Sequence, residues 1–431
     1  MVREIKDKSK DRSKDISIMT KVILTRYLYV LDEVMHSLLH ALLTKTSMEE
    51  CAFWLGEIYY SGYKKQLWTF IWCIYYDFYA ITFPKYEKKM TKLYQGWLNK
   101  PTIISLLACI QLFYYSSATV DVFCLRMMKA NVPTKVYVGR LPGWVKKLNL
   151  TKTERNLVRS VHDGNLSNIA YHMRYFQDSP LLAYTAIKTY FRTICNLRLS
   201  DASLKDLPYE NKYHIVLATI CYLLRDEKDI RKKIVCLKLD MNKYQQMYLQ
   251  SNVTVCPLYK TLLQRRTYTI SSNIGGFELA RFMLPVMADG KALTPSTILW
   301  DHWEYFAYRT PCWKARFDQY QIVVNHENYE IVFKDVEEEE AFYEKWYYEP
   351  DEQKKEVQQC SLIDIQPVDL ITWMGLWAPL EKGTEQYEKL KSQLYCRKPY
   401  ISWDETRQVE TATKNKVENI SIKINTEKNS D

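Results

Sequence analysis

Apolar side chains recur at helical spacing along most of the chain from Val22 to Arg225. The clearest stretch is Ser47–Phe83, where apolar and aromatic residues return every three or four positions on both sides of Ser61-Gly62. Ser47 and Glu50 fit a capping box, in which the serine hydroxyl accepts from the Glu50 amide and the carboxylate reaches back. Because glycine tolerates the left-handed conformation beyond a helix end, this stretch predicts two antiparallel helices joined by a tight turn.

The same spacing predicts further helices on both sides of this hairpin. We expect helices near residues 22–45, 48–60, 63–83, 86–98, 102–129, 153–163, 167–177, 180–196 and 211–225. Aligning Ser61-Gly62 with Ser179-Pro180 brings one turn signal onto another and places Trp72 on Tyr190 without a gap. The match indicates a repeated helical hairpin, which is typical of HEAT-like scaffolds. A chance match between two amphipathic helices is the alternative, and the sequence leaves both open.

From Thr267 onward the pattern changes, because turn residues become denser. We expect a tryptophan-rich helix at Thr297–Tyr308, a β-hairpin formed by Gln321–Val324 and Tyr329–Phe333, and an acidic helix at Glu337–Tyr348. The predicted fold class is therefore mainly α: a helical-hairpin (HEAT-like) repeat scaffold with a small irregular or α+β carboxy-terminal region.

Changes in composition give the predicted segment boundaries. We expect a disordered leader at 1–18, an N-terminal helical unit at 19–128, a basic linker at 129–150, a second helical unit at 151–266, an aromatic and acidic region at 267–403 and a disordered tail at 404–431. Met19 directly precedes the first apolar periodic segment, and whether it is the true start stays open.

Composition narrows the class of protein. Only 11 glycines and 14 prolines occur in 431 residues, which favours helices over a turn-rich β fold. The net charge of +10 suggests an anionic partner, although lysine-rich composition also follows from AT-rich codons. The 11 cysteines contain no C-x-x-C pair, so we expect neither a zinc ribbon nor a thioredoxin-type site. Scattered cysteines of odd number indicate a reducing compartment. We expect no secretory signal, because charged and polar residues dominate the first eighteen positions. We expect no membrane insertion, because the apolar stretches Leu67–Phe83 and Ile103–Tyr115 are short or interrupted, by Asp77 and Gln111.

Motifs that carry chemistry are scarce. Asp32, His36 and His40 would share a helix face, as metal ligands can, but neighbouring leucines make that face part of a core, so we expect no metal site. His162-Asp163-Gly164 is interpreted as the end of a helix. Phosphate-binding, dinucleotide and nucleophile-elbow motifs are absent from the sequence. We expect no cofactor and no small-molecule substrate, while an enzyme that lacks known motifs stays open.

One candidate surface is basic. Between Lys129 and Arg159, eight basic residues accompany a single acidic one, with aromatic rings interleaved, and such groups can neutralise phosphates and stack on unpaired bases. The candidate nucleic-acid-binding residues are Lys135, Tyr137, Arg140, Trp144, Lys146, Lys147, Lys152, Arg155 and Arg159. The alternative, which we favour, is a solvated lysine-rich surface with Trp144 filling the core between helical units.

The other candidate surface is acidic and aromatic. Its candidate protein-binding residues are Glu337, Glu338, Glu339, Glu340, Phe342, Trp346 and Tyr347. A helix of this composition can bind a basic partner, or it can fold back on the basic surface of its own chain.

Several short motifs resemble one known group of proteins. These are Phe53–Gly62, Trp300–Ala307, Pro311-Cys312-Trp313, Phe342-Tyr343 and Tyr348–Gln353. They resemble an uncharacterised α-helical protein family of the nucleocytoplasmic large DNA viruses, the giant viruses, over much of residues 30–380. The resemblance implies a viral origin and a location in the host cytoplasm or a cytoplasmic viral factory, with the virion also open. It brings no catalytic residues.

Our hypothesis is a non-enzymatic viral scaffold or adaptor that acts through contacts with viral or host proteins. An RNA- or single-strand-binding factor in viral transcription or translation is the first alternative, with the basic surface as its site. A structural component of the virion is the second alternative.

Overall fold

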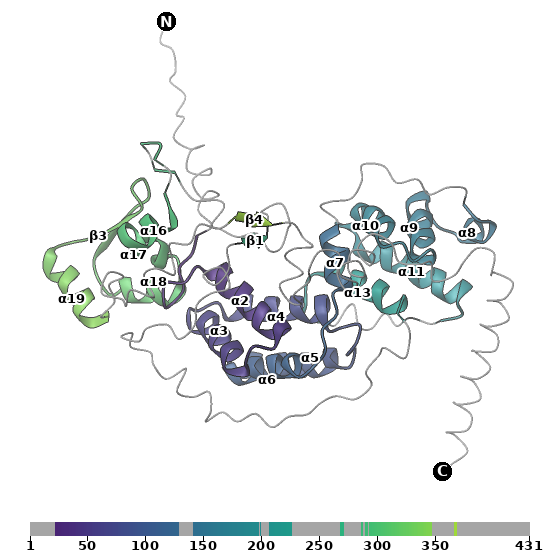
Figure 1. Cartoon of the computed structure of the whole chain (residues 1–431), viewed down its shortest axis with the longest axis horizontal. Helices are drawn as coiled ribbons and strands as arrows, with labels where there is room; N and C mark the ends of the chain where they lie inside the picture. Colours follow the sequence, from purple (N-terminus) through teal and green to yellow (C-terminus); the bar gives the residue numbers. More distant parts are fainter. Residues whose placement is uncertain are drawn as a thin grey trace, which may run out of the picture. The chain divides into compact units, whose positions relative to one another are not determined.

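The computed structural model describes residues 22–128, 141–197, 199, 207–225, 268–270, 286–287, 289–291, 293–346 and 366–368. Contacts group the chain into two compact units, each assembled from segments that are separate in sequence (Figure 1). Unit one comprises Met1–Ile71, Lys92–Ser116 and Val235–Pro379, and unit two comprises Trp72–Thr91, Ser117–Ile234 and Leu380–Asp431. The sequence patterns, in contrast, suggested a division into consecutive segments.

The chain is mainly helical, which confirms the mainly α prediction, while a HEAT-like repeat stays a prediction. The first helices are α2 (Leu31–Thr44), α3 (Met48–Tyr60), α4 (Lys64–Phe78), α5 (Tyr86–Asn99), α6 (Ile103–Tyr114) and α7 (Asp121–Met128). They are followed by α8 (Gly143–Lys147), α9 (Lys152–His162), α10 (Leu166–Met173), η1 (Arg174–Phe176), α11 (Pro180–Ile194) and α13 (Lys212–Leu223). The last ones are α16 (Pro295–Asp301), α17 (Trp303–Tyr308), α18 (Pro311–Phe317) and α19 (Val336–Trp346).

Local signals explain where these helices begin and end. The Ser47 hydroxyl accepts from the Glu50 amide at 3.0 Å, as the capping pattern predicted, and the Glu50 carboxylate accepts from the indole of Trp54. Gly62 has a φ of +104°, which a residue with a side chain rarely adopts, and it makes the turn between α3 and α4. The predicted helix end at His162 is confirmed, because α9 stops there and Gly164 follows at positive φ.

Several predicted helices are shorter or broken. The helix expected over 63–83 ends at Phe78, the last residue of α4. Residues 22–30 form a compact turn before α2, closed by a bridge between Leu24 and Val30. The helix expected over 102–129 is interrupted between α6 and α7, where the Thr119 amide donates to the carbonyl of Phe78. The tryptophan-rich helix is divided at His302 into α16 and α17. In each case apolar spacing continues across the break, so periodicity alone could not locate it.

In unit one, the start of α18 forms hydrogen bonds with residues 24–25 and with the α3–α4 turn. The buried Thr310 hydroxyl donates to the carbonyl of Leu24 at 2.6 Å, and the Trp313 indole donates to that of Thr25 at 3.1 Å. The Cys312 amide donates to the carbonyl of Ser61 in the α3–α4 turn at 3.2 Å. The carbonyl of Thr25 also accepts from the Leu28 amide, so the long-range bonds add to a local turn, and residues 24–25 and 310–313 share one core.

A buried ion pair also lies in unit one. Both Glu57 oxygens accept bonds, Oε2 from the Arg26 guanidinium at 3.0 Å and Oε1 from the Tyr27 amide at 2.8 Å. Glu57 is fully buried, and α3 carries it while packing on α2 and α6. Satisfying both oxygens is what makes a buried carboxylate tolerable.

The predicted β-hairpin is confirmed as β2 (Ile322–Asn325) and β3 (Glu330–Phe333), paired antiparallel with Val323 opposite Val332. It lies beside α17 and α19. Two further strands, β1 (Tyr268–Ile270) and β4 (Gln366–Val368), pair in parallel register and were not predicted from the sequence.

Unit two is built from packed helices with an aromatic core. In it α10 packs on α7 and α9, and α13 packs on α7 and α11. Thr151 and Glu154 form a complete capping box at the start of α9. Trp72, Tyr76 and Tyr209 stack on one another, with Tyr76 and Tyr209 centroids 5.3 Å apart.

Candidate interaction surfaces and a buried polar network

The basic candidate residues are only partly brought together. Lys135, Tyr137 and Arg140 lie outside the described residues. The other members of the set divide into exposed lysines and partly buried side chains. The exposed ones are Lys146 and Lys147 on α8 and Lys152 at the start of α9; the partly buried ones are Trp144, Arg155 and Arg159.

Trp144 lies against the other side chains of unit two. Its ring centroid is 4.7 Å from that of His162 and 5.4 Å from that of Tyr190. Arg159 is paired with Asp163 one turn later, at 2.6 Å between Nε and Oδ2. Ring packing of this kind leaves Trp144 less of its face for stacking on a base. The three exposed lysines are therefore the described members best placed to meet phosphate.

The acidic candidate residues fall on α19, with different roles for its polar and aromatic members. Glu337, Glu339 and Glu340 are exposed, whereas the Glu338 carboxylate accepts from the backbone amide of Gln321 at 2.6 Å. Phe342 is fully buried and stacks on a phenylalanine of α18 with centroids 4.5 Å apart. Tyr347 lies outside the described residues.

Trp346, the last acidic-surface member that the structure places, covers a buried cation. The Arg316 guanidinium lies between two indoles, 4.3 Å from the Trp313 centroid and 4.5 Å from that of Trp346. Burial lowers the pKa of Arg316. Such stacking over two rings stabilises a partly desolvated guanidinium and anchors the end of α19 on α18.

The hairpin beside α19 exposes apolar side chains that the sequence did not single out. Val323 is 67% exposed, its cross-strand partner Val332 is 49% exposed, and Val336 at the start of α19 is 66% exposed. We call these three residues the valine face. The opposite face of the hairpin points inward, because Phe333 is buried and packs on Phe342. The sequence predicted the hairpin, but which of its two apolar faces would be buried depends on the packing of Phe342, which lies outside the strands.

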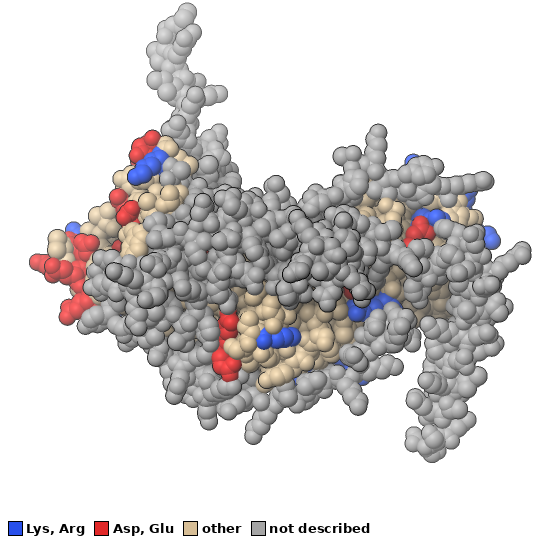
Figure 2. Space-filling view, in the orientation of Figure 1, with Lys and Arg blue, Asp and Glu red and all other residues tan. Residues whose placement is uncertain are grey.

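Charge around the valine face is strongly negative. Residues 321–346 contain eight carboxylates and two lysines, although the chain as a whole has a net charge of +10. Figure 2 shows acidic side chains gathered over α19, and Glu330 is exposed on β3. The local field is therefore opposite in sign to that of the chain as a whole.

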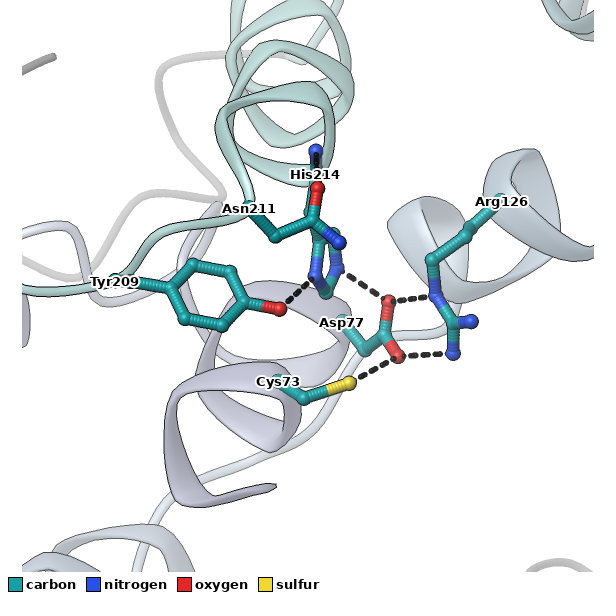
Figure 3. A network of polar contacts seen from close by, with 6 residues as sticks. All are labelled: Cys73, Asp77, Arg126, Tyr209, Asn211 and His214. Atoms are coloured by element: carbon teal, nitrogen blue, oxygen red, sulfur yellow. Dashed lines mark hydrogen bonds and ion pairs between the residues drawn. The ribbon is translucent and has the colours of Figure 1, made fainter. Parts of the chain in front are cut away.

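Unit two contains a buried polar network that sequence reading missed (Figure 3). Asp77 on α4 is at its centre, accepting from Arg126 Nε at 3.1 Å and from its terminal nitrogen at 2.7 Å. His214 Nε2 lies 2.7 Å from the same carboxylate, and its Nδ1 lies 3.0 Å from the Tyr209 hydroxyl. Cys73, one turn before Asp77, donates to it at 3.6 Å. The available signal was a lone aspartate within an aromatic helix.

The residue types of the network resemble those of a catalytic relay, but the pKa values of its thiol and its phenol are raised, which favours their protonated forms. Burial would raise the pKa of Asp77, yet the charges of Arg126 and His214 outweigh it and hold that pKa well below its usual range. Burial and the Asp77 charge raise the pKa of the Cys73 thiol to about 12, and burial raises that of Tyr209. A protonated thiol and a protonated phenol are poor nucleophiles. The bonds of the network connect α4, α7 and α13.

The possible metal ligands of α2 do not assemble. His36 and His40 are buried, and burial lowers the pKa of His36 to about 4. Among the residues that the structure describes, no three His, Cys, Asp or Glu side chains are arranged to hold a metal ion. Likewise, no helix in the described ranges is long and apolar enough to cross a membrane.

No protein-family model matches the chain, and neither a curated protein nor a solved structure shows significant similarity to it. Inference about its function therefore starts from its own side chains.

Proposed function

We propose that this protein is a scaffold that works through protein–protein contacts, with the valine face of unit one as a contact site. The observation that carries the proposal is the exposure of Val323 and Val332 as cross-strand neighbours, with a third exposed valine, Val336, at the start of the acidic helix. Clustered exposed apolar side chains rimmed by polar ones are typical of interaction sites.

The support beneath this face is rigid. Phe333, Phe342 and Phe317 pack together under the hairpin, and Arg316 holds the end of α19 between two indoles. A contact site on a packed base binds with less loss of conformational entropy than one on a mobile loop. A helical-hairpin, HEAT-like arrangement belongs to the same proposal and rests on the sequence pattern. A viral origin and a place in the host cytoplasm or viral factory also belong to it, and they are what the resemblance to the giant-virus family implies.

The test is retention of partners by the tagged full-length chain, purified from infected host cells with and without nuclease treatment. Val323→Asp combined with Val332→Asp should release partners that the natural chain retains after nuclease. Leu182→Ser, which changes a leucine 55% exposed on α11 of unit two, is the matched control and should retain them. Equal retention by all three proteins would contradict the proposal.

Binding of RNA or single-stranded nucleic acid is a second candidate, supported by the exposure of Lys146, Lys147 and Lys152. Neutralising phosphates with these lysines would make affinity fall steeply with salt. Substituting all three by glutamine should weaken binding of a labelled single strand and flatten its salt dependence. Unchanged affinity in this variant would exclude the surface.

A further inference from the structure

Among the described residues, one edge of the hairpin of unit one has no strand beside it. Within the described part of the chain, β3 lies beside α17 and α19, and β2 pairs with β3 alone. The carbonyl of Gln321 accepts from the Lys334 amide, so hydrogen-bonded pairs alternate along the ladder from that point. The amide and carbonyl groups of Ile322 and Val324 consequently face away from β3. An edge of this kind is a template for another strand.

The side chains on the two faces of that edge define what could be added. Val323 lies on the outer face, with Val332. Ile322 is paired with Phe333 on the inner face, where Phe333 packs on Phe342 of α19. A strand added beside β2 would therefore present alternate side chains to the valine face and to the α19 side.

The charge of α19 determines which side chains suit the inward-facing positions of the added strand. α19 packs on the inner face of the hairpin through Phe342, and it carries exposed Glu337, Glu339 and Glu340. Residues 321–346 as a whole contain eight carboxylates and two lysines. Lysine or arginine at the inward-facing positions would meet opposite charge, whereas acidic side chains would be repelled. β-Branched residues at the alternate positions would pack beside Val323 and extend the valine face by one strand.

We infer that the open edge of β2 accepts an extended, lysine-bearing strand from a partner protein. The inference rests on the proposed scaffold function and adds the class of partner and the manner of binding. Main-chain bonds at Ile322 and Val324 supply affinity, while the valine face and the α19 carboxylates supply specificity.

The probe is a fluorescent peptide of alternating lysine and valine, titrated into the full-length chain and followed by anisotropy. The natural chain should bind it, and binding should weaken as salt is raised to about 0.3 M, since charge pairs contribute. A peptide with glutamate in place of lysine should not bind. Equal binding of both peptides would overturn the inference.

Val324→Pro tests the edge itself. Proline removes the outward amide of Val324 without removing a bond to β3, and edge positions tolerate it. Affinity for the lysine–valine peptide should fall about tenfold or more, by analogy with the loss of main-chain pairing. Glu337→Gln with Glu339→Gln and Glu340→Gln should lower affinity at low salt and reduce its salt dependence. Undiminished binding by a folded Val324→Pro chain would overturn the inference.

Amide exchange of the natural chain keeps the test decisive if the proline variant does not fold. Bound peptide should slow exchange at Ile322 and Val324, and unchanged exchange there despite binding would refute strand addition. If the chain dimerises without peptide and Val324→Pro makes it monomeric, the edge pairs with a second copy and the partner-strand inference is wrong. Failure of the peptide while Val323→Asp with Val332→Asp still releases cellular partners would refute this inference alone.

Discussion

Gly62 tests the contact between the α3–α4 turn and the start of α18 in unit one. It forms the turn between α3 and α4 with a φ of +104°. A Cβ added there would lie 2.5 Å from Cβ and 3.0 Å from Cγ of Pro311, at the start of α18. The Gly62→Ala variant therefore meets both a backbone conformation unsuited to alanine and a rigid proline ring.

The expected loss has two sources of similar size. Holding a non-glycine residue at such a φ costs about 1–3 kcal/mol. Forcing an extra methyl group into a packed contact costs about 1–3 kcal/mol more, because the proline ring cannot rotate away. We expect Gly62→Ala to lower the free energy of unfolding by about 2–6 kcal/mol, the sum of these ranges.

Gly96 provides a control of opposite sign. It lies within α5, and a Cβ added there meets nothing within 4 Å. Gly96→Ala should stabilise the protein by about 0.5–1 kcal/mol, since alanine restricts the unfolded chain and glycine weakens a helix interior. The two substitutions are chemically identical, so only their surroundings can make their effects differ in sign.

Urea denaturation of the full-length chain measures both effects. Pro311→Gly removes the ring, and the cost of Gly62→Ala measured in that background should fall by about 1 kcal/mol or more, which is a typical coupling between residues in contact. A Gly62→Ala chain as stable as the natural one would refute the turn conformation. A cost that is unchanged by Pro311→Gly would refute the contact between the turn and α18.

Three further predictions concern buried charges. Asp77→Asn leaves the Arg126 guanidinium buried without its counter-charge and should lower the free energy of unfolding in urea by about 3–5 kcal/mol. The control, Asp318→Asn at an exposed i,i+4 pair, should lower it by at most about 1 kcal/mol. Equal losses would contradict a structural role of the network. Burial lowers the pKa values of His162 and His172 to about 4. The unfolded chain therefore takes up protons first as pH falls below about 6.5, and the free energy of unfolding should drop by about 1–2 kcal/mol per histidine at pH 5. The variant with both histidines changed to glutamine should show a flatter dependence of stability on pH. Arg316→Lys should destabilise more than Arg316→Met in thermal unfolding, because an ammonium cannot stack as a plane between two indoles, and the reverse order would refute the stacking.

Sequence patterns located most helices of the described chain because helix formation leaves a local, periodic signature. Ser47 marks the start of α3, and Gly62 marks the turn between α3 and α4, in both cases through local interactions. The grouping into two units has no such signature, since it depends on bonds such as that from Thr310 to Leu24, which are far apart in sequence. No local pattern tells which distant carbonyl a threonine will reach.

For the candidate sites too, local features could be predicted from the sequence and long-range contacts could not. The acidic side chains of α19 were predicted as a surface, but Phe342 became its buried anchor, because aromatic residues at helical spacing are recruited by the core. Asp77 was noted in the sequence only as an interruption of an apolar stretch. Its importance arises from Arg126 and His214, which come from two other helices and approach within 3.1 Å of its carboxylate.

Binding and stability should be separable in unit one, because the side chains proposed for each lie on opposite faces of the same hairpin. Val323 and Val332 are exposed, so polar substitution there removes little buried area and should change the free energy of unfolding by less than about 0.5 kcal/mol. Phe333 and Phe342 pack beneath them, and truncating either to alanine should cost about 3–5 kcal/mol. If valine substitutions instead destabilised the chain to that extent, the valine face would be covered by the protein itself, and both proposals would lose their site.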